Sequence, residues 1–547
     1  MSILLCFASG LQAEVAISPA DQDAINRQQK MLLEQAQQQR ESLQNSLSLP
    51  SSPEPAPGTS AGTCQKISQI VFQGAEHLSS SVKRKLTGPR LGHCLTLRDI
   101  NQLVRETTAA YLKQGYITSR AWLPQQDISG GVLTVAASEG RIAAISIDGQ
   151  EPLALKMAFP GLAGSILNLR DLEQGLDQLN RLSSRQFTID IRPDSRPGYS
   201  RVVLRPGSSR LPFTVTLGAD NSGQKSSGTG QMNTSLVVDN PLYLADQWMI
   251  SAARDDQFCH CHRSRSLSGS VTIPYGYWLF SYQTFWNDFY QDVPFQGTSY
   301  RYQGSTLTQR IDVNRTLLRD GQQKLALNTA LSHRRAQTRL AQQRLMISSP
   351  TLTSLNIALN YSRTLGGGYL TLSPAVSRGL HIMGATPDDP QFPGVPRSGF
   401  RKFSLSASYF YPVTASLYYL TSIYGQTSPD NLYPSERIFT GGQYSVRGFK
   451  EHYLTGNQGA YWRNELNWQL ITMPGVGSIG LTGALDTGWT QKRAGNSDGG
   501  SVTGAAFGIS FSNRWFSQTI TAGKPLAWSD SIQPDHWVAY WQATFTL

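Results

Sequence analysis

The chain has 547 residues, of which 39% are hydrophobic, 10% are aromatic and only 16% are charged, a mixture unusual for a water-soluble enzyme. No run of about eighteen apolar residues occurs, which excludes a membrane-spanning helix, so the chain can cross a membrane only as a closed barrel of strands. The net charge of +11 comes from scattered basic residues without a basic-aromatic motif. This argues against nucleic acid as a partner and favours a positively charged lumen or contact with anionic lipid.

Residues 1–13 are similar to the end of a secretory signal peptide. An apolar run covers Ile3–Ala8, and the small residue Ala13 precedes Glu14. The basic segment that usually opens a signal is missing, so we expect the true start to lie further upstream. The alternative is a partly buried N-terminal strand. Removal of a signal would take Cys6 with it and leave four cysteines, an even number that favours disulfides in an exported chain.

Residues 18–47 are predicted to form one helix, within a segment that we bound at 14–48. Pro19 occupies the first helical position after Ser18, and Asp21 lies in the first turn, both typical of a helix start. The following residues are rich in Gln, Glu and Arg and contain few apolar side chains. Such a helix is either solvated or housed in a wet cavity. Residues 49–63 are rich in Pro, Ser and Gly, which predicts a flexible linker.

Two similar units follow at 64–140 and 141–208, each with the predicted order β-α-α-β-β. The repeat is visible where Thr96-Leu-Arg-Asp99 matches Asn168-Leu-Arg-Asp171, since each places a capping residue three positions before an acid at the start of the second helix. This pattern indicates a duplicated α/β module. We expect the elements of the first unit at 67–72, 79–86, 97–115, 120–123 and 132–136, and those of the second at 144–147, 153–159, 169–182, 187–191 and 201–204.

The cysteines suggest one disulfide and one ambiguous pair. Cys64 directly precedes the first strand of its unit and Cys94 lies just before the second helix, so we expect a disulfide between them. Cys259-His-Cys-His262 offers ligands that zinc accepts, but no second Cys/His pair lies nearby in the sequence to complete four ligands. A local disulfide or two unreactive thiols are the alternatives, and we predict no metal.

From residue 209 to the end, short segments alternate apolar and polar residues, as strands do when their two faces meet different surroundings. Examples lie at 213–220, 325–332, 355–362 and 403–409, and the last segment is the clearest. Its apolar face consists of Trp537, Ala539, Trp541, Ala543, Phe545 and Leu547, whereas Tyr540, Gln542, Thr544 and Thr546 point the other way.

The number and composition of these segments favour a membrane barrel. About sixteen strands can be counted, which is enough for an aqueous lumen. All the tryptophans except Trp122 fall in this region, many near strand ends, as the aromatic girdles of such barrels require. A soluble β-sandwich or propeller is the alternative. It is disfavoured because the apolar faces carry many aromatic residues while the opposite faces are small and polar.

Enzyme motifs were sought and do not fit their context. Gly58–Gly62 and Gly495–Gly499 both match G-x-S-x-G, but a nucleophile elbow needs a strand before it and a helix after it. One match lies in the Pro-rich linker and the other in a polar loop. No phosphate-binding G-x-x-x-x-G-K-[ST] motif occurs. The sequence therefore predicts no catalytic residues, no cofactor and no step driven by ATP.

Several motifs resemble those of the two-partner secretion transporters, relatives of filamentous-haemagglutinin, haemolysin-activator and contact-dependent-inhibition transporters. The resemblance covers nearly the whole mature chain. Its strongest part is Val446-Arg-Gly-Phe449 in a long loop followed by an Asp-containing strand motif. The α/β motifs are Tyr111–Arg120, Leu123–Ile128, Gly131–Val135 and Ser138–Ile142, and the barrel motifs are Gly441–Phe449, Gly459–Leu466 and Gly483–Gly488.

The resemblance implies α+β periplasmic modules and an all-β part: an N-terminal plug helix, two POTRA domains and a 16-stranded antiparallel transmembrane barrel. It further implies that the long loop folds back into the lumen, where the tip residues lock it to the inner wall. The implied tip is Val446, Arg447, Gly448 and Phe449, and its partners on the wall are Gly483, Asp486 and Gly488. Without the family context, Arg447 reads as a solvated loop residue and Asp486 as one facing a watery lumen.

By the same resemblance, the first POTRA domain docks the exported partner. The motif residues implied in docking are Arg120, Leu123, Pro124, Gln125 and Asp127. Two departures from the family pattern remain. The chain ends in Leu547 instead of an aromatic residue, although Phe545 is close, and Cys259–His262 has no counterpart among the family motifs.

The implied function is a pore in the outer membrane of a Gram-negative cell, with its POTRA domains in the periplasm. It would secrete a large exoprotein (an adhesin, haemolysin or contact-dependent toxin) that carries an N-terminal two-partner secretion domain. Outer-membrane lipid and the barrel assembly machinery would be its other partners. A general outer-membrane protein assembly factor is the main alternative, but it would have more periplasmic repeats. A porin would lack the two α/β units, and a surface adhesin would carry its bulk outside.

Overall fold

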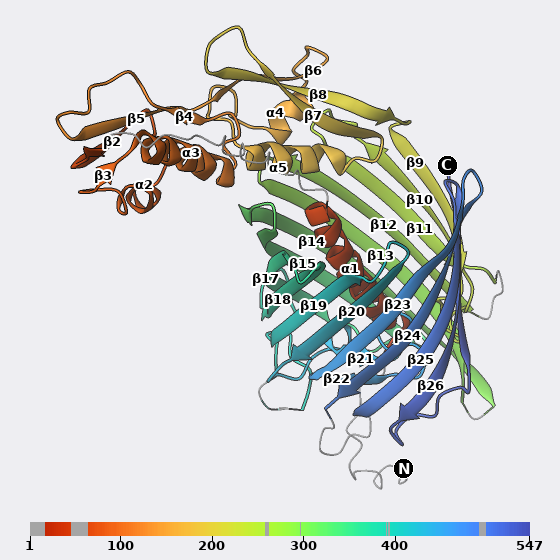
Figure 1. Cartoon of the computed structure of the whole chain (residues 1–547). Coiled ribbons are helices and arrows are strands. Elements are labelled where there is room, and N and C mark those ends of the chain that lie inside the picture. Colours follow the sequence, from red (N-terminus) through yellow and green to blue (C-terminus); the bar gives the residue numbers. More distant parts are fainter. Residues whose placement is uncertain are drawn as a thin grey trace.

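The computed structural model describes residues 17–44, 64–257, 262–295, 297–389, 391, 394–491 and 499–547. The chain runs through an N-terminal helix, two small α/β units and a large barrel (Figure 1). Several predictions lie outside the described residues. These are the signal at 1–13, the linker at 49–63 with its Gly58–Gly62 motif, Cys259 and Cys261, and all of Gly495–Gly499 except Gly499.

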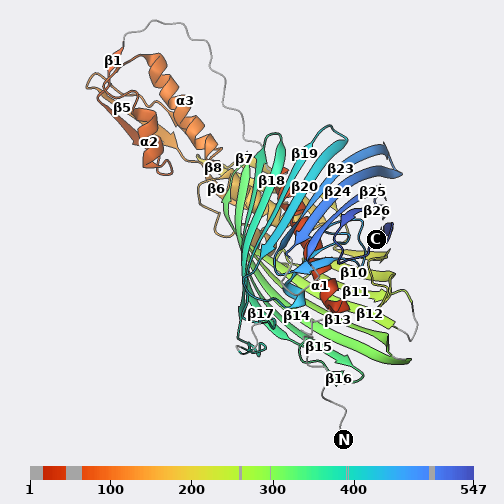
Figure 2. The same ribbon diagram turned by 90° about the horizontal axis from the view of Figure 1, so that it is seen from below.

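Helix α1 (Pro19–Gln44) begins at Pro19, as the sequence predicts. Ser18 and Asp21 fix this start reciprocally: the Asp21 amide donates to Ser18 Oγ at 3.1 Å, and Ser18 Oγ donates to Asp21 Oδ2 at 2.7 Å. The helix lies inside the barrel in both ribbon views (Figures 1 and 2). Of the two places open to such a polar helix, the structure selects the cavity.

The first α/β unit contains a three-stranded sheet in the order β2-β5-β4 with two helices on one face. Burial of apolar residues such as Leu103, Leu133 and Val135 between the helices and the sheet forms its core. The opposite sheet face is open. The elements are β1 (Gln65–Lys66), β2 (Gln69–Gln73), α2 (Ser80–Thr87), β3 (Cys94–Leu95), α3 (Leu97–Lys113), β4 (Arg120–Trp122) and β5 (Val132–Ser138).

The second unit repeats this arrangement with the sheet order β6-β8-β7. Its core includes Leu172, Leu179 and Val202. The two units are joined tightly, because the Leu169 amide donates to the Gly115 carbonyl at 2.8 Å. The elements are β6 (Arg141–Ile147), α4 (Leu153–Ala158), α5 (Leu169–Asn180), β7 (Arg185–Pro193) and β8 (Tyr199–Ser209).

The matched helix starts of the two units behave differently. In the first, Thr96 and Asp99 form a full capping box: the Asp99 amide donates to Thr96 Oγ1 at 3.3 Å and the Thr96 amide to Asp99 Oδ2 at 2.9 Å. In the second, Asn168 still caps α5, but the prediction that Asp171 takes part in the helix cap is wrong. Its carboxylate accepts a hydrogen bond from Tyr277 Oη at 2.5 Å instead. The acid is diverted because this unit packs against the barrel.

Sixteen long antiparallel strands close the barrel among the described residues, with β27 pairing back to β9. They are β9 (Phe213–Asp220), β10 (Gln231–Asp239), β11 (Gln247–Asp255), β12 (His262–Tyr275), β13 (Trp278–Phe295), β14 (Thr298–Arg319), β15 (Gln323–Leu340), β17 (Thr351–Leu365), β18 (Gly368–Leu380), β19 (Arg401–Pro412), β20 (Leu417–Thr427), β23 (Gly459–Met473), β24 (Gly477–Thr490), β25 (Gly500–Ser512), β26 (Phe516–Trp528) and β27 (Val538–Thr546). A two-residue strand, β16 (Gln343–Arg344), pairs with β15.

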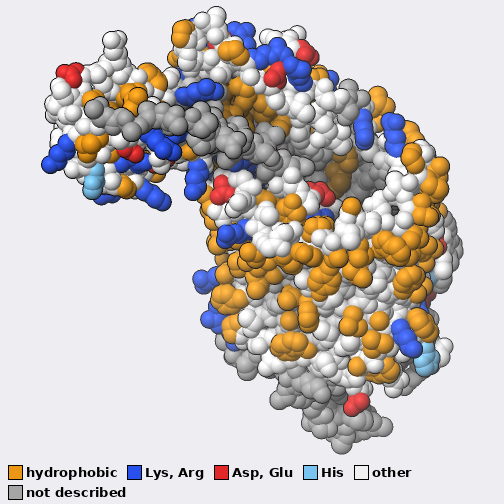
Figure 3. All heavy atoms as spheres, viewed as in Figure 1, with side chains coloured by type: hydrophobic (Ala, Val, Ile, Leu, Met, Phe, Trp, Pro, Cys, Tyr) orange, Lys and Arg blue, Asp and Glu red, His pale blue; other side chains and the backbone are white. Residues whose placement is uncertain are grey.

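The alternation in the sequence corresponds to the two faces of the barrel wall. Predicted apolar positions such as Phe403, Leu405 and Trp541 are exposed on the outside, whereas Tyr540 and Asn360 on the opposite face are buried. Hydrophobic side chains cover much of the barrel face that is visible in Figure 3. The predicted fold class, a helix, two α/β modules and a 16-stranded barrel, is confirmed.

Within the described ranges, no helix has the length and apolarity needed to cross a membrane. The same part of the chain contains no group of three or more His, Cys, Asp or Glu side chains placed to hold a metal ion.

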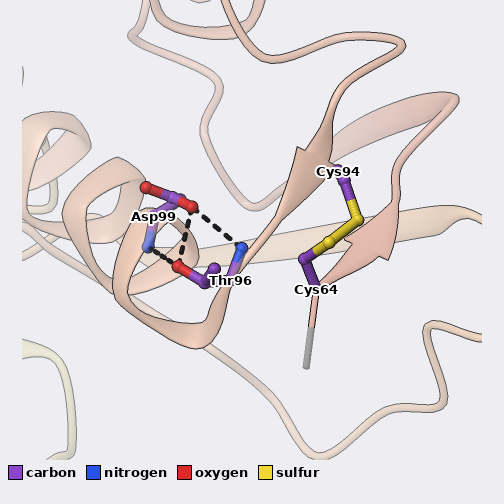
Figure 4. Close-up of a disulfide and its surroundings, with 4 residues drawn as sticks. All are labelled: Cys64, Cys94, Thr96 and Asp99. Atoms are coloured by element: carbon purple, nitrogen blue, oxygen red, sulfur yellow. Dashed lines mark hydrogen bonds between the residues drawn. A yellow bond between two sulfur atoms is a disulfide. The ribbon is translucent and has the colours of Figure 1, made fainter. Parts of the chain in front are cut away.

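Cys64 and Cys94 are joined by a disulfide at one end of the first unit, with their Cα atoms 5.3 Å apart and a separation of 30 positions in sequence (Figure 4). The bond ties the strand pair β1–β3 beside the capped start of α3. In the chain-entropy view, closing a loop of this length stabilises the folded unit by about 3–4 kcal/mol.

We predict that the double substitution Cys64→Ser/Cys94→Ser lowers the unfolding free energy of this unit by about that amount. Urea unfolding, monitored by limited proteolysis within residues 64–140, measures the change. The reduced wild-type chain is the matched control. Non-reducing peptide mapping should recover the two cysteine peptides joined. Their recovery as free thiols from protein exported to an oxidising compartment would contradict the bond.

Candidate functional site: a loop and a helix inside the barrel

Residues 428–458, between β20 and β23, form a long loop that turns back into the barrel. The loop carries the short helix η1 (Pro434–Glu436) and a hairpin of β21 (Ile438–Thr440) and β22 (Leu454–Gly456). Its apolar residues pack with residues of the wall into one buried cluster, which also touches Leu32 of α1. The cluster consists of Tyr424, Ile438, Val446, Phe449, Leu454, Tyr461 and Val502.

Arg447 at the loop tip forms a salt bridge with Asp486 of β24, the contact that the family resemblance implied. Nε donates to Oδ2 at 2.7 Å and Nη2 donates to Oδ1 at 2.8 Å, which is the bidentate geometry that a guanidinium favours. The backbone amide of Arg447 adds a third bond to Oδ2 at 3.1 Å. Arg447 is 6% exposed and Asp486 is 0% exposed. The solvated alternative for both residues is therefore excluded by the structure.

Two further charges complete this cluster; both lie within the Gly459–Leu466 motif, but neither was predicted to belong to the site. Glu465 Oε1 lies 3.0 Å from Arg447 Nη1 and 2.7 Å from Arg463 Nη2. Arg463 also donates to the Gln443 carbonyl of the loop at 3.1 Å. Two cations and two anions thus balance in a buried site, which lowers the cost of removing them from water. Strand parity could have revealed them, because Arg463 and Glu465 share the inward face of β23 while Trp462 faces out.

Glycines on the wall make room for the loop tip. A Cβ at Gly488 would lie 3.0 Å from Val446, and one at Gly504 would lie 1.9 Å from the Arg447 carbonyl oxygen. Gly448 has φ +106, which only glycine adopts readily, and a side chain there would meet the backbone of Lys524. Gly504 was missed by the sequence analysis because no motif marks it. Tyr540 Oη fixes the far end of the tip by donating to the Phe449 carbonyl at 2.8 Å.

The assignment of Gly483 to the inner-wall partner is wrong. It lies an odd number of positions from Asp486, so it faces outward with Leu485, and a Cβ built there meets nothing within 4 Å. Successive residues of a strand point to opposite faces, which is the physical reason that Gly488 contacts the loop and Gly483 does not.

Helix α1 is held in the lumen by separate contacts along its length. Asp21 pairs with Arg334 of β15 at 2.7 Å, and Gln29 donates to the Phe439 carbonyl in the loop hairpin at 2.9 Å. Further along, Gln35 donates to Asn360 Oδ1 at 2.8 Å. The guanidinium of Arg27 lies 3.3 Å from the centre of the Phe285 ring. The helix is thus attached to both the wall and the loop by polar contacts instead of a large apolar core.

The C-terminal end of α1 reaches a junction with the second α/β unit. Asp177 of α5 accepts from Arg319 Nη1 at 2.5 Å and from Lys324 Nζ at 3.4 Å. Ser42 of α1 donates to the same carboxylate at 3.3 Å. Helix, α/β unit and barrel therefore meet at one side chain.

The predicted docking residues of the first unit divide into two groups. Arg120 and Gln125 are exposed and free of the core, whereas Leu123 packs against the core and Pro124 is half-buried. Asp127 is exposed but serves its own loop: it accepts from the Ser129 amide and hydroxyl, each at 2.9 Å, and these bonds hold its pKa below the usual range. Leu123 is partly buried and its side chain packs against the core, so its role as a docking contact stays a prediction.

A side chain outside the predicted docking set shares the open sheet face with Arg120. Trp122 lies two residues further along β4 and is 47% exposed. Its register partner is Ala136 of β5, and Val71 of β2 is exposed on the same face. An exposed Trp in a small unit is unusual and is a feature of binding surfaces.

Comparisons with known proteins find matches for the barrel and for both α/β units. Residues 198–511 match the family described as haemolysin secretion/activation protein ShlB/FhaC/HecB. Residues 65–140 match a ShlB-type POTRA domain, and residues 141–193 match a POTRA domain.

The outer membrane transporter CdiB of Escherichia coli is 41% identical over 544 residues, which covers 98% of this chain and 92% of the relative. The haemolysin transporter protein ShlB of Serratia marcescens is 30% identical over 490 residues, covering 88% and 85%. The solved structure of CdiB from Escherichia coli superposes with a TM-score of 0.93 at 40% identity and covers 98% of this chain and 100% of the solved one. CdiB from Acinetobacter baumannii, at 23% identity and a TM-score of 0.82 over 98% of this chain and 100% of that one, shares the fold.

The buried loop tip, the helix in the lumen and these similarities lead to one assignment. The chain belongs to the ShlB/FhaC/HecB family of haemolysin secretion/activation proteins and is an outer-membrane β-barrel transporter with two POTRA domains, not an enzyme.

Proposed function

We propose that this transporter secretes one large partner exoprotein, of the haemolysin, adhesin or contact-dependent toxin class, that carries an N-terminal two-partner secretion domain. The observation that carries the proposal is the filling of the lumen by α1 and the loop 428–458, both fastened by polar side-chain contacts. Segments held in this way can leave or rearrange without opening a strand pair. Relatives named haemolysin transporter and outer membrane transporter support the cargo class.

The resting and conducting states differ, in this proposal, in the position of α1. The helix is polar over most of its surface, so it can move from the wet lumen into the periplasm with little loss of apolar burial. The Pro-, Ser- and Gly-rich composition of residues 49–63 predicts a linker long enough for this movement. No ATP-binding motif occurs in the sequence, so folding of the emerging partner outside the cell supplies the free energy.

The first POTRA domain receives the partner on its open sheet face, at Arg120, Trp122 and Gln125. Exposed Trp and Arg side chains are common anchors of binding energy. Barrel assembly machinery inserts the chain, and outer-membrane lipid surrounds it.

The test of this function is secretion of the exoprotein encoded beside this chain, which should be very large and should begin with a β-helical secretion domain. Deletion of the transporter should stop its release while the abundance of other outer-membrane barrels stays unchanged. A general fall in those barrels would instead favour the alternative, an outer-membrane protein assembly factor.

We predict that Arg447→Ala reduces secretion to background without preventing barrel insertion. Removing one member of a buried ion pair leaves an uncompensated charge and costs about 3–5 kcal/mol, here in docking of the loop tip. Asp486→Ala should have a related defect. The double variant should be less than additively impaired, because the two residues act through one contact. Partner in the medium and heat-modifiability of the barrel on gels are the measurements.

The matched control for Arg447 is Arg397→Ala. Arg397 is half-exposed and lies 3.9 Å from Asp430, a buried acid at the start of the same loop that Arg401 also holds at 3.0 Å, so losing this longer contact costs little. Its loss should leave secretion intact. Normal secretion by Arg447→Ala would refute the role of the loop tip.

Deletion of residues 18–47 is expected to raise the single-channel conductance in planar bilayers, because α1 occupies the lumen. Arg334→Ala, which removes the contact to Asp21, should leave the mean conductance near the wild-type value and increase its fluctuations. The barrel should stay inserted in both cases. Conductance that the deletion does not change would argue that the helix does not block the pore.

We predict that Trp122→Ala weakens binding of the partner's purified N-terminal domain to the full-length transporter by about tenfold, the usual effect of losing an aromatic anchor. Arg120→Ala should weaken it less. Leu97→Ala is the control, since Leu97 is 61% exposed in the same unit but begins α3 on the other face. If Trp122→Ala and Arg120→Ala bind the partner domain as tightly as the Leu97→Ala control does, docking lies elsewhere.

A further inference from the structure

A cavity of about 410 Å³ lies between the second POTRA domain and the periplasmic rim of the barrel. One wall is formed by the end of α4 and the start of α5. The other is formed by the turn between β12 and β13 and by the end of β14. The residues that carry the argument are Pro160, Leu162, Asp171, Trp278, Arg315 and Leu317.

The packing around this cavity is firm, so it is a formed site. The Gly276 amide in the β12–β13 turn donates to the Met157 carbonyl at 2.8 Å. Gln178 of α5 donates back to the Gly276 carbonyl at 3.1 Å. A Cβ at Gly276 would lie 2.9 Å from Pro160, so the domain contacts the turn directly.

The barrel side of the cavity belongs to the outer face of the wall. Tyr275 pairs with Trp278 across β12 and β13, and Trp278 pairs with Arg315 across β13 and β14. Directly paired residues share a face, and exposed Phe280 and Ile311 place that face outside. The cavity therefore opens where the outside of the barrel meets the periplasm, away from the lumen.

Two opposite charges line the cavity. Asp171 Oδ1 accepts from Tyr277 at 2.5 Å, but Oδ2 has no hydrogen bond in the part of the chain that the structure describes. Burial raises the pKa of the Asp171 carboxyl, and the hydrogen bond from Tyr277 only partly offsets this effect. A cation beside the carboxylate would therefore be favourable. The Arg315 guanidinium lies 4.7 Å from the centre of the Trp278 ring. It forms no hydrogen bond or ion pair with any described residue.

We propose that this cavity binds the headgroup of one zwitterionic phospholipid, phosphatidylethanolamine, from the periplasmic leaflet of the membrane. The ammonium would meet Asp171 and the phosphate would meet Arg315. The volume is at the lower end for ligand pockets, roughly 300–1,000 Å³, which suits a headgroup and excludes two acyl chains. The chains would run along the outer wall past Leu317, which is exposed at the rim.

The features of the site separate this ligand from others. An exported polypeptide crosses the lumen, whereas the cavity opens outside it. An anionic lipid such as phosphatidylglycerol would satisfy Arg315 but bring no cation to Asp171. Aromatic residues and Arg at the membrane interface are suited to hold a phosphate there. The inference is independent of which polypeptide the transporter exports.

The experiment is native mass spectrometry of the full-length transporter titrated with phosphatidylethanolamine, phosphatidylglycerol or water-soluble glycerophosphoethanolamine. We expect the first bound phosphatidylethanolamine to be preferred over phosphatidylglycerol. Arg315→Ala and Asp171→Asn should each weaken it by about tenfold, the effect of losing one hydrogen bond to a charged group. Arg315→Lys should retain most of the binding, because it keeps the cation.

Arg514→Ala is the matched control. Arg514 lies 4.7 Å from the ring centre of Trp515, at the same end of the barrel, but borders no part of this cavity, so its loss should leave the preference unchanged. Heat-modifiability confirms that each variant is folded. Equal binding of the two lipids, or wild-type binding by both cavity variants, would overturn the proposal. Glycerophosphoethanolamine that binds as tightly as the lipid would overturn the assignment of the ligand as a lipid.

Discussion

The requirement that every backbone polar group in a membrane be paired shapes this molecule. Sixteen strands satisfy it only because β27 pairs back to β9 and leaves no edge. A barrel of that size encloses a wide lumen, and the lumen must be filled if the resting membrane is to stay sealed. Helix α1 and the loop 428–458 fill it. The site is thus a consequence of the barrel's width.

The way the lumen is filled explains how a sealed barrel can also be a transporter. The loop tip is fixed by a buried, charge-balanced cluster of two Arg and two acidic side chains, and by glycines that let its backbone approach the wall. Helix α1 is fixed by separate polar contacts along its length and by Leu32, which touches the loop cluster. The loop is therefore the more firmly held of the two, which is consistent with the proposal that the helix is the part that leaves.

Asp177 and Asp171 show how the second POTRA domain links the parts. Both lie on α5, and one meets Arg319 and Ser42 at the lumen edge while the other meets Tyr277 at the outer rim. The domain thus contacts the inside of the barrel, the helix and the outer face at once. A shift of this domain on partner docking would change the contacts at each of these places.

The sequence by itself determined the elements, the strand alternation and, through its motifs, the pair Arg447–Asp486, because periodicity and local motifs are properties of neighbouring residues. Only the tertiary structure decided that Glu465 and Gly504 join the lock, that Gly483 faces away, that Leu123 serves the core and that Asp171 leaves its helix cap for Tyr277. These depend on which distant strands meet and in which register. A one-residue change of register turns every side chain to the other face.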